Sequence, residues 1–294
     1  MLMTSFEVIR SDTAVTANDG TELYKYVWEP GRFAGQVLLL HGFGEHALRY
    51  EHVAQFLVHN GYRVIAYDQR GHGATGLRQW GGDFGRLGRV GPGGQRAVVA
   101  DAKTMLESMR DEHPDVPLGI IAHSWGSLTA QTLINDDAKL ADAAVLTGTA
   151  WRRFGRMNSG DLNKRHAHLG TTGGEWLTRD EEMVAAWLAD PLTIEVTVLK
   201  LLGPIESLKL LGRPARELSQ DLPLLIASGS DDAIGEPSSL QQLGDDYRNR
   251  SGLTDVTVKV FPGARHEILN ETNRVEVLAY IETWLTDRLG LSQV

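Results

Sequence analysis

Short apolar runs rich in Val, Ile and Leu alternate along this chain with longer amphipathic stretches, and this alternation limits the folds open to it. A continuous apolar run is typical of a strand buried on both faces, as in parallel sheets covered by helices. Strands are predicted at residues 37–40, 62–67, 118–122, 144–146, 222–227 and 256–261, and helices at about residues 48–60, 95–112, 126–136, 238–249 and 273–288. The pattern therefore predicts an α/β protein with a mostly parallel central sheet flanked by helices.

The N-terminal region has a different pattern, in which apolar and polar residues alternate. Residues 6–9 and 13–17 alternate in this way, and the turn signal Asn18-Asp19-Gly20 leads into a further run at residues 23–28. This arrangement predicts an antiparallel hairpin ahead of the parallel strands.

One interval, between Leu146 and Leu222, contains no clear buried strand. It begins with a Gly-, Ser- and Thr-rich, locally basic stretch and continues with helical patterns at residues 181–188 and 194–202. The interval is short and core strands flank it, so we expect an inserted helical lid rather than an independent domain. The predicted organisation is a core of residues 1–150 and 219–294 with a lid at residues 151–218.

Composition excludes several kinds of chemistry. The 294 residues include no cysteine, which removes disulfides, thiolate zinc sites, iron–sulfur clusters and cysteine nucleophiles. The net charge of −9 argues against non-specific nucleic-acid binding, which needs a basic face. The first residues lack the pattern of a signal peptide, and no apolar run is long enough to span a membrane, so we expect a cytoplasmic protein.

The sharpest local signal is Ala122-His123-Ser124-Trp125-Gly126, which lies where a predicted strand gives way to a predicted helix. Small residues two positions before and after a serine, on such a turn, are typical of a nucleophile elbow. A serine hydroxyl is a poor nucleophile at neutral pH, so it needs a histidine base and a carboxylate that orients the base. We therefore predict that Ser124 is a catalytic nucleophile.

Both partners of this serine are expected later in the chain. His266 is the only histidine after the predicted lid, and it follows the last predicted strand. Asp231 and Asp232 follow the preceding strand, and Asp232 is favoured because of its distance from Gly229. Ser124, Asp232 and His266 have the chain order of an α/β-hydrolase triad, so we predict that they form one.

An acyl-transfer site also needs donors for the tetrahedral oxyanion, and these are usually backbone amides. The amide of Trp125, directly after the nucleophile, is one candidate. The amide of Phe43 is the other, because it belongs to the glycine-containing loop that follows the strand at residues 37–40.

Several motifs together resemble the α/β-hydrolases of the monoacylglycerol lipase and lysophospholipase-like branch, of the serine aminopeptidase S33 type. The matching pieces are residues 41–46 with Arg49-Tyr50, residues 67–73, the elbow, residues 177–180 with Asp190-Pro191-Leu192, residues 229–232 and residues 263–267. They extend over about residues 20–285. The chain departs from the family pattern at Ala122, where glycine is usual, at Thr75, where serine is usual, and at the bulky Trp125.

The resemblance implies that the lid covers an acyl pocket and can make transient contact with a membrane or micelle. Apolar side chains of the lid are the expected lining of this pocket. The substrate-binding candidates are Trp151, Trp187 and Leu188, with Leu199, Leu201 and Leu202 as further lining residues.

Three other patterns are interpreted as structural. Residues 71–76 fit G-x-G-x-x-G, but the chain continues into a second Gly-rich stretch instead of opening a helix, so no dinucleotide site is expected. Five histidines are interpreted as loop or surface residues that bind no metal: His41, His46, His52, His166 and His168. Five basic residues of the lid are interpreted as a solvated face rather than a contact for anionic lipid: Arg152, Arg153, Arg156, Lys164 and Arg165.

These features lead us to expect a serine carboxylic-ester hydrolase that forms an acyl-enzyme and needs no metal or organic cofactor. Its expected partner is a small-molecule ester, a monoacylglycerol or another medium-sized acyl ester. Three alternatives stay open: a lactone or non-lipid ester hydrolase, an acyltransferase that uses an alcohol other than water, and a non-catalytic scaffold that binds a small ligand. The sequence leaves the oligomeric state open as well.

Overall fold

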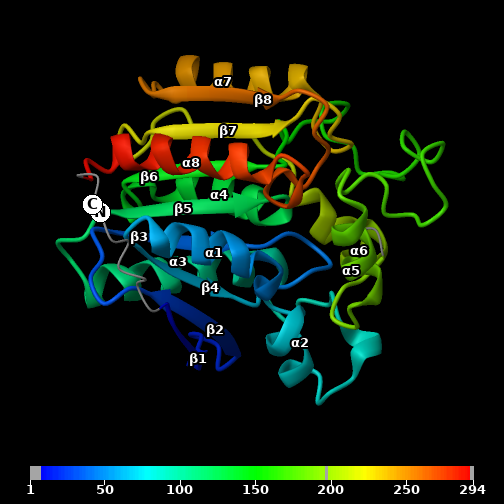
Figure 1. The fold of residues 1–294 in the computed structure, drawn as a ribbon, viewed down its shortest axis with the longest axis horizontal. Helices are drawn as coiled ribbons and strands as arrows, with labels where there is room; N and C mark the ends of the chain where they lie inside the picture. Colours follow the sequence, from blue (N-terminus) through cyan, green and yellow to red (C-terminus); the bar gives the residue numbers. More distant parts are fainter. Residues whose placement is uncertain (1–7, 196–197, 292–294) are drawn as a thin grey trace, which may run out of the picture.

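A computed structural model describes residues 8–195 and 198–291, and its core is one eight-stranded sheet with helices on both faces (Figure 1). The strands are β1 (Ile9–Thr16), β2 (Glu22–Glu29), β3 (Gly35–Leu40), β4 (Tyr62–Tyr67), β5 (Leu118–His123), β6 (Ala143–Thr147), β7 (Leu224–Gly229) and β8 (Val256–Phe261). Their order across the sheet is β1-β2-β4-β3-β5-β6-β7-β8.

The pairing of the strands confirms the predicted sheet. All pairs among β3 to β8 are parallel, whereas β1 pairs antiparallel with β2, and β2 with β4. The predicted N-terminal hairpin is therefore present, although residues 6 and 7 of that prediction lie outside the described residues.

The helices are α1 (Glu51–His59), α2 (Gly73–Gln79), α3 (Gly94–Glu112), α4 (Trp125–Asp136), α5 (Glu181–Ala189), α6 (Val198–Leu208), α7 (Pro237–Asn249) and α8 (Arg274–Arg288). Five of them, α1, α3, α4, α7 and α8, confirm the helices predicted for the core. α2 was not predicted. α6 overlaps the helical pattern predicted at residues 194–202, of which residues 196 and 197 lie outside the described residues. α6 also bends at Gly203, which has a φ of 76° and precedes Pro204.

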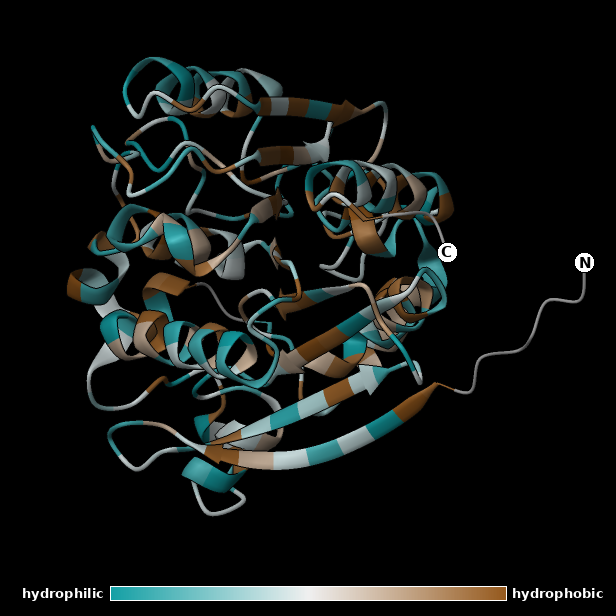
Figure 2. Ribbon diagram, turned by 90° about the vertical axis from the view of Figure 1, so that its left-hand side faces the viewer, coloured by the Kyte–Doolittle hydropathy of each residue, from teal (hydrophilic) through white to brown (hydrophobic). Residues whose placement is uncertain are grey.

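Two apolar layers hold the helices to the sheet. Alternate side chains of β3, such as Leu38 and Leu40, pack against α3, α4 and α7 on one face. The intervening ones, Val37 and Leu39, pack against α1 and α8 on the other face. Every residue of the five strands β3, β4, β5, β6 and β7 is buried. Burial on both faces explains why these strands appear in the sequence as apolar runs. Figure 2 shows hydrophilic residues mixed into β1 and β2, at the edge of the sheet.

The carboxyl ends of the parallel strands meet at one edge of the sheet, and residues 151–218 lie at this edge with α5 and α6 (Figure 1). The loops that follow β3, β5, β7 and β8 all begin here, so residues far apart in the sequence come together. Of the helices in the described ranges, none combines the length and the apolar character that a membrane span requires.

Candidate active site

Ser124 occupies the sharp turn between β5 and α4. Its φ of 51° and ψ of −121° are unusual, since it is the one non-glycine residue with positive φ among residues 8–195 and 198–291. A Cβ at Gly126 would lie 2.5 Å from the carbonyl oxygen of Leu40, so only glycine allows β3 to pass this close to the turn. Backbone strain of this kind concentrates at functional sites, and here it is the geometry of a nucleophile elbow.

His266 and Asp232 lie in hydrogen-bonding contact in the loops after β8 and β7. The Nδ1 atom of His266 is 3.0 Å from Oδ1 of Asp232, and both side chains are buried. The same Oδ1 accepts a hydrogen bond of 2.8 Å from the amide of Ile234, and the hydroxyl of Ser228 donates to Oδ2. With its Nδ1–H directed at the carboxylate, the imidazole has Nε2 left to accept a proton.

The imidazole of His266 lies beside the serine turn. Its ring centroid is 4.7 Å from that of His123, the residue before Ser124. A Cβ at Gly148 would lie 2.8 Å from Cε1 of His266. The carbonyl of Thr147, the residue before Gly148, accepts a hydrogen bond of 2.9 Å from the backbone amide of Ser124. The ends of β5, β7 and β8 therefore bring the predicted nucleophile, base and carboxylate to one place.

Electrostatics favour the protonation states that the predicted triad needs. Burial lowers the pKa of His266, but the charge of Asp232 and its hydrogen bond outweigh burial, so the pKa lies above its ordinary value. Burial raises the pKa of Asp232, and the charge and hydrogen bond of His266 reverse this, so the net pKa is lowered. Asp232 is therefore ionised beside the imidazole, as the carboxylate of a base–carboxylate pair must be.

The two neighbouring aspartates have separate partners. Asp231, the less favoured residue in the sequence, pairs with Arg165 at 2.7 Å and with His166 at 3.1 Å. Both partners belong to residues 151–218. Asp231 thus holds this segment to the core, whereas Asp232 contacts His266.

The loop after β3 brings the second expected oxyanion donor to the serine. A Cβ at Gly42 would lie 3.0 Å from the Cβ of Ser124, which places the Gly42–Phe43 peptide beside the nucleophile. The rings of Phe43 and Trp125 meet edge to face with centroids 5.5 Å apart. Neither backbone amide donates a hydrogen bond to another residue in the described part of the chain. Both are thus available to a substrate oxygen.

A buried ionic network that the sequence did not reveal lies behind this loop. The carboxylate of Glu45 accepts hydrogen bonds from the amide of Gly42, from Arg49 and, at 2.6 Å, from the hydroxyl of Tyr50. Arg49 also binds Glu267, the neighbour of His266. The i, i+4 spacing of Glu45 and Arg49 was a visible signal, but the contact with Glu267 depends on the fold.

The segment of residues 151–218 is hydrogen-bonded to the loop after β3 and to the loop after β8. The amide of Ile194 donates to the carbonyl of Gly44 at 2.8 Å, and Nε2 of His46 lies 2.8 Å from Oδ2 of Asp190. At the other loop, the amide of Glu267 donates to the carbonyl of Leu177 at 2.7 Å. The segment therefore contacts the backbone of the loop after β3 and of the loop that carries His266.

The residues expected to line an acyl pocket divide into three sets. Leu202 and Val198 pack against an apolar cluster that Phe43 also contacts. The cluster consists of Val90, Val98, Trp125, Leu128 and Leu210. Leu201 reaches Gly88, and Trp187 is buried within the segment. Leu188 and Leu199 are 43% and 51% exposed, and this placement argues against them as lining residues.

Trp151 lies apart from the triad. Its indole nitrogen donates to Oδ2 of Asp246 on α7 at 2.7 Å, and its amide donates to the hydroxyl of Ser239 at 2.9 Å. These contacts make Trp151 part of the junction with α7, so the structure does not support it as a substrate-binding residue.

The solvated basic face predicted for the segment is wrong at Arg152. This side chain is 4% exposed and donates to Gln131 at 3.1 Å and to Thr132 at 2.8 Å, both on α4. It joins the first residues of the segment to the helix that follows Ser124. The other four basic residues, Arg153, Arg156, Lys164 and Arg165, are exposed.

Four of the five histidines interpreted as loop or surface residues, His41, His46, His166 and His168, lie in loops, whereas His52 lies on α1. The side chains of His41, His46 and His166 are buried. The prediction that the G-x-G-x-x-G stretch does not open a helix is wrong, because α2 begins at Gly73. The amide of Ala74 at its start is occupied by the carboxylate of Asp68 at 2.7 Å, so this terminus is already neutralised by a side chain. No group of three or more metal-ligating side chains occurs in the described ranges.

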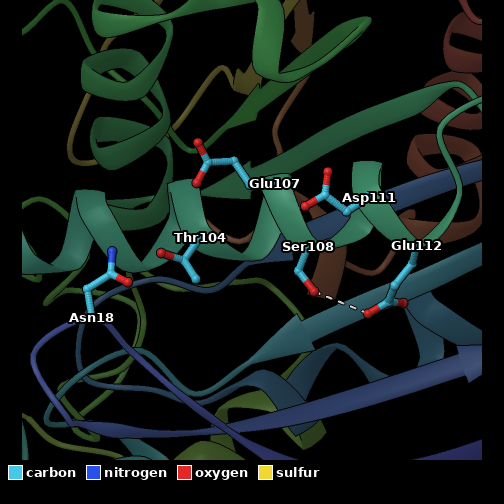
Figure 3. A pocket seen from close by; sticks show the side chains of 6 residues that line it. All are labelled: Asn18, Thr104, Glu107, Ser108, Asp111 and Glu112. Carbon is cyan, nitrogen blue, oxygen red and sulfur yellow. Dashed lines mark hydrogen bonds between the residues drawn. The ribbon is translucent and has the colours of Figure 1, made fainter.

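A hollow on the described surface lies along α3 (Figure 3). It has a volume of about 500 Å³ and is lined by Asn18, Thr104, Glu107, Ser108, Asp111 and Glu112. Figure 3 shows polar side chains that extend from one face of the helix, with Ser108 donating to Glu112 at 3.1 Å. None of these residues belongs to the loops that carry Ser124, Asp232 and His266.

Comparison with known proteins agrees with this geometry. The family model "Serine aminopeptidase, S33" matches residues 31–273. Monoacylglycerol lipase of Mycolicibacterium smegmatis is 28% identical, covering 95% of this chain and 98% of the relative. Human monoglyceride lipase is 26% identical, covering 92% and 88%.

Solved structures show the same fold. A thermostable carboxyl esterase from Bacillus coagulans has a TM-score of 0.80 at 21% identity, covering 96% of this chain and 100% of that one. A soluble variant of Saccharomyces cerevisiae monoglyceride lipase has a TM-score of 0.73 at 19% identity, covering 98% and 97%. Because its family model covers most of the sequence, the chain belongs to the serine aminopeptidase S33 family and is a monoacylglycerol lipase-like α/β-hydrolase, a carboxylic ester hydrolase.

Proposed function

We propose that this chain hydrolyses carboxylic esters through an acyl-enzyme formed on Ser124. The observation that carries the proposal is the contact between His266 and Asp232, with Nδ1 and Oδ1 3.0 Å apart, beside a serine held at a φ of 51°. A scaffold that only binds a ligand has no need of a strained serine next to an oriented base.

Each residue then has one step. The hydroxyl oxygen of Ser124 attacks the acyl carbonyl while Nε2 of His266 takes its proton, and the amides of Phe43 and Trp125 bind the oxyanion. The intermediate collapses, and the leaving alcohol receives the proton from His266. Water, activated by the same imidazole, then releases the acid. Asp232 holds the imidazole in the required tautomer throughout.

The proposed substrate is a monoacylglycerol or another medium-sized acyl ester. The names of the relatives support this choice, as does the apolar cluster beside the nucleophile, which includes Trp125 and Leu128. The cytoplasmic location expected from the sequence stays a prediction. The oligomeric state stays open.

We propose that residues 151–218 act as the lid of this pocket. The inner side of α6, with Val198 and Leu202, packs on the apolar cluster beside the nucleophile. Three other side chains of α6 are exposed, Leu199 by 51%, Ile205 by 74% and Leu208 by 55%, and they form an apolar outer side that can contact a membrane or micelle.

The test is hydrolysis of p-nitrophenyl esters from acetate to palmitate, and of monoacylglycerols, by the wild type and by Ser124→Ala. Ser159→Ala is the matched control, because Ser159 is exposed in the segment. The proposal predicts hydrolysis that Ser124→Ala abolishes and Ser159→Ala retains, with a preference for medium chains. Equal activity of Ser124→Ala and wild type would overturn it, and product analysis in the presence of an added alcohol separates hydrolysis from acyl transfer.

A further inference from the structure

His72, which the mechanism does not use, lies next to both oxyanion residues. Its ring centroid is 5.1 Å from that of Phe43 and 5.1 Å from that of Trp125. The residue follows β4 and directly precedes α2, and its side chain is fully buried.

The position of His72 is fixed by its backbone. Its amide donates to the carbonyl of Gln69 at 2.9 Å, and its own carbonyl accepts the amide of Gly76 at 2.7 Å. Asp68 supports the same turn, because its carboxylate accepts the amides of Ala47 at 2.9 Å and Ala74 at 2.7 Å. The imidazole is thus held by a rigid turn rather than by a loose loop.

One nitrogen of this imidazole has a partner and the other has none. Nδ1 lies 2.8 Å from the carbonyl oxygen of Arg70, so Nδ1 carries the hydrogen. Nε2 is buried and has no hydrogen-bond partner in residues 8–195 and 198–291. Burial lowers the pKa of His72 to about 4, so at neutral pH Nε2 is a bare acceptor.

Neighbouring polar groups cannot satisfy this acceptor, because their hydrogens are already in use. The indole nitrogen of Trp125 donates to Gln95 at 2.8 Å. His41, whose ring is 5.6 Å from that of His72, donates from Nδ1 to the carbonyl of Gly42 and accepts the amide of Gln69 at Nε2. A buried acceptor without a donor is costly, so a donor from outside the protein would be stabilised here.

We infer that Nε2 of His72 accepts a hydrogen bond from a hydroxyl group of the substrate, and that His72 thereby determines a preference for hydroxyl-bearing esters. The lone pair of Nε2 repels an oxyanion or a carboxylate, and the cost of burying a charge disfavours an ammonium group. An uncharged hydroxyl is the donor that an ester substrate can bring, on its alcohol part or on its acyl chain. This inference rests on the proposed ester hydrolysis at Ser124.

The test compares kcat/KM for two pairs of esters that differ in a hydroxyl. Decanoylglycerol against methyl decanoate examines the alcohol part, and methyl 3-hydroxydecanoate against methyl decanoate examines the acyl part. Three variants separate the nitrogens: His72→Gln keeps an acceptor near the position of Nε2, His72→Asn keeps only a donor near Nδ1, and His72→Phe keeps only the ring.

In one of the two pairs, we expect the preference for the hydroxylated ester to fall about tenfold in His72→Asn and His72→Phe and to be largely retained in His72→Gln. Whichever pair responds identifies the part of the substrate that His72 contacts. Ratios that are the same in wild type and all variants, for both pairs, would overturn the inference.

A second measurement needs no variant, in case substitutions at this buried site impair folding. Alkylboronic acids with and without a hydroxyl group on the alkyl chain are compared as inhibitors of the wild type. A compound hydroxylated on the chain should have an inhibition constant about tenfold lower, whereas equal inhibition constants would count against a hydroxyl site. Methyl decanoate hydrolysis by wild type and Ser124→Ala is measured in parallel. If only the hydroxyl preference is absent, the His72 inference fails alone; if Ser124→Ala matches wild type, the proposed function fails with it.

Discussion

Arg49 donates two hydrogen bonds, of 2.7 and 2.9 Å, to the carboxylate of Glu267, the residue that directly follows His266. The same guanidinium binds Glu45, whose carboxylate holds the amide of Gly42. Burial raises the pKa of Glu267, but Arg49 outweighs this effect and the net pKa is lowered, so Glu267 is ionised. A single buried cation therefore connects the loop after β3 with the loop that carries His266.

The first prediction concerns this connection. Glu45→Gln replaces one of the two oxygens that accept from Arg49 and from the amide of Gly42 with an NH2 group. This change weakens the hold on Gly42, so the Phe43 amide should be less well placed. We expect kcat to fall about ten- to a hundredfold, less than for loss of a whole oxyanion donor, with KM little changed. Glu107→Gln, on the exposed side of α3, is the control. An unchanged kcat in Glu45→Gln would show that the network is structural only.

The second prediction distinguishes the two neighbouring aspartates. Asp232→Asn leaves the shape of the site but favours the wrong tautomer of His266, so kcat should fall on the order of 10⁴-fold. Asp231→Asn should change kcat by less than about threefold, because its contacts are with Arg165 and His166. Steady-state kinetics on one p-nitrophenyl ester checks both, and near-full activity of Asp232→Asn would refute its assignment.

The third prediction is a pH profile. His266 acts as a base only when neutral, so kcat/KM should be full above its pKa and fall as the pH drops through it. The Asp232 charge raises this pKa above the ordinary value of 6.5, so the acidic limb should have its midpoint above 6.5. In Asp232→Asn the acidic limb of the residual activity should have its midpoint at a lower pH, because the charge that raises the pKa of His266 is absent. A limb that does not shift between the two proteins would contradict the assigned pair.

A fourth prediction concerns stability of the elbow. Gly126→Ala would place a Cβ 2.5 Å from the carbonyl oxygen of Leu40, and backbone must shift to accept it. The free energy of unfolding should fall by about 1–3 kcal/mol or more. Gly31→Ala is the control, since nothing lies within 4 Å of a Cβ there. Chemical denaturation measures both, and equal stability would mean that the turn relaxes easily.

The fifth prediction separates two leucines of α6 that the sequence treated alike. Leu202 packs against the Trp125 cluster, whereas Leu199 is 51% exposed. Leu202→Ala should therefore change the chain-length preference on soluble p-nitrophenyl esters, and Leu199→Ala should leave it unchanged. Equal effects of the two substitutions would count against the proposed pocket.

The sequence predicted the core well because its signals are local. Strands such as β3 and β5 are buried on both faces and so appear as continuous apolar runs, and the elbow combines small residues with a strand-to-helix change. Ser124, Asp232 and His266 could be chosen from the sequence because each lies shortly after a recognisable strand, β5, β7 or β8.

Other features could not be predicted because they depend on distant partners. Arg152 looked solvated within a basic stretch, but α4 supplies Gln131 and Thr132 to its guanidinium. Trp151 looked like a pocket residue, but Asp246 on α7 binds its indole. The short helix α2 was not predicted because its glycines are unfavourable within a helix. Asp68, which lies outside the helix, stabilises its first turn by accepting the amide of Ala74.

The most direct test of the central claim is covalent labelling of the purified protein with an alkyl fluorophosphonate, followed by intact mass measurement and peptide mapping. A strained serine beside an activated histidine should gain one phosphonyl group, located on Ser124, with loss of esterase activity in proportion. Ser124→Ala should remain unlabelled. A single adduct on another residue, or full esterase activity after Ser124 is labelled, would contradict the account.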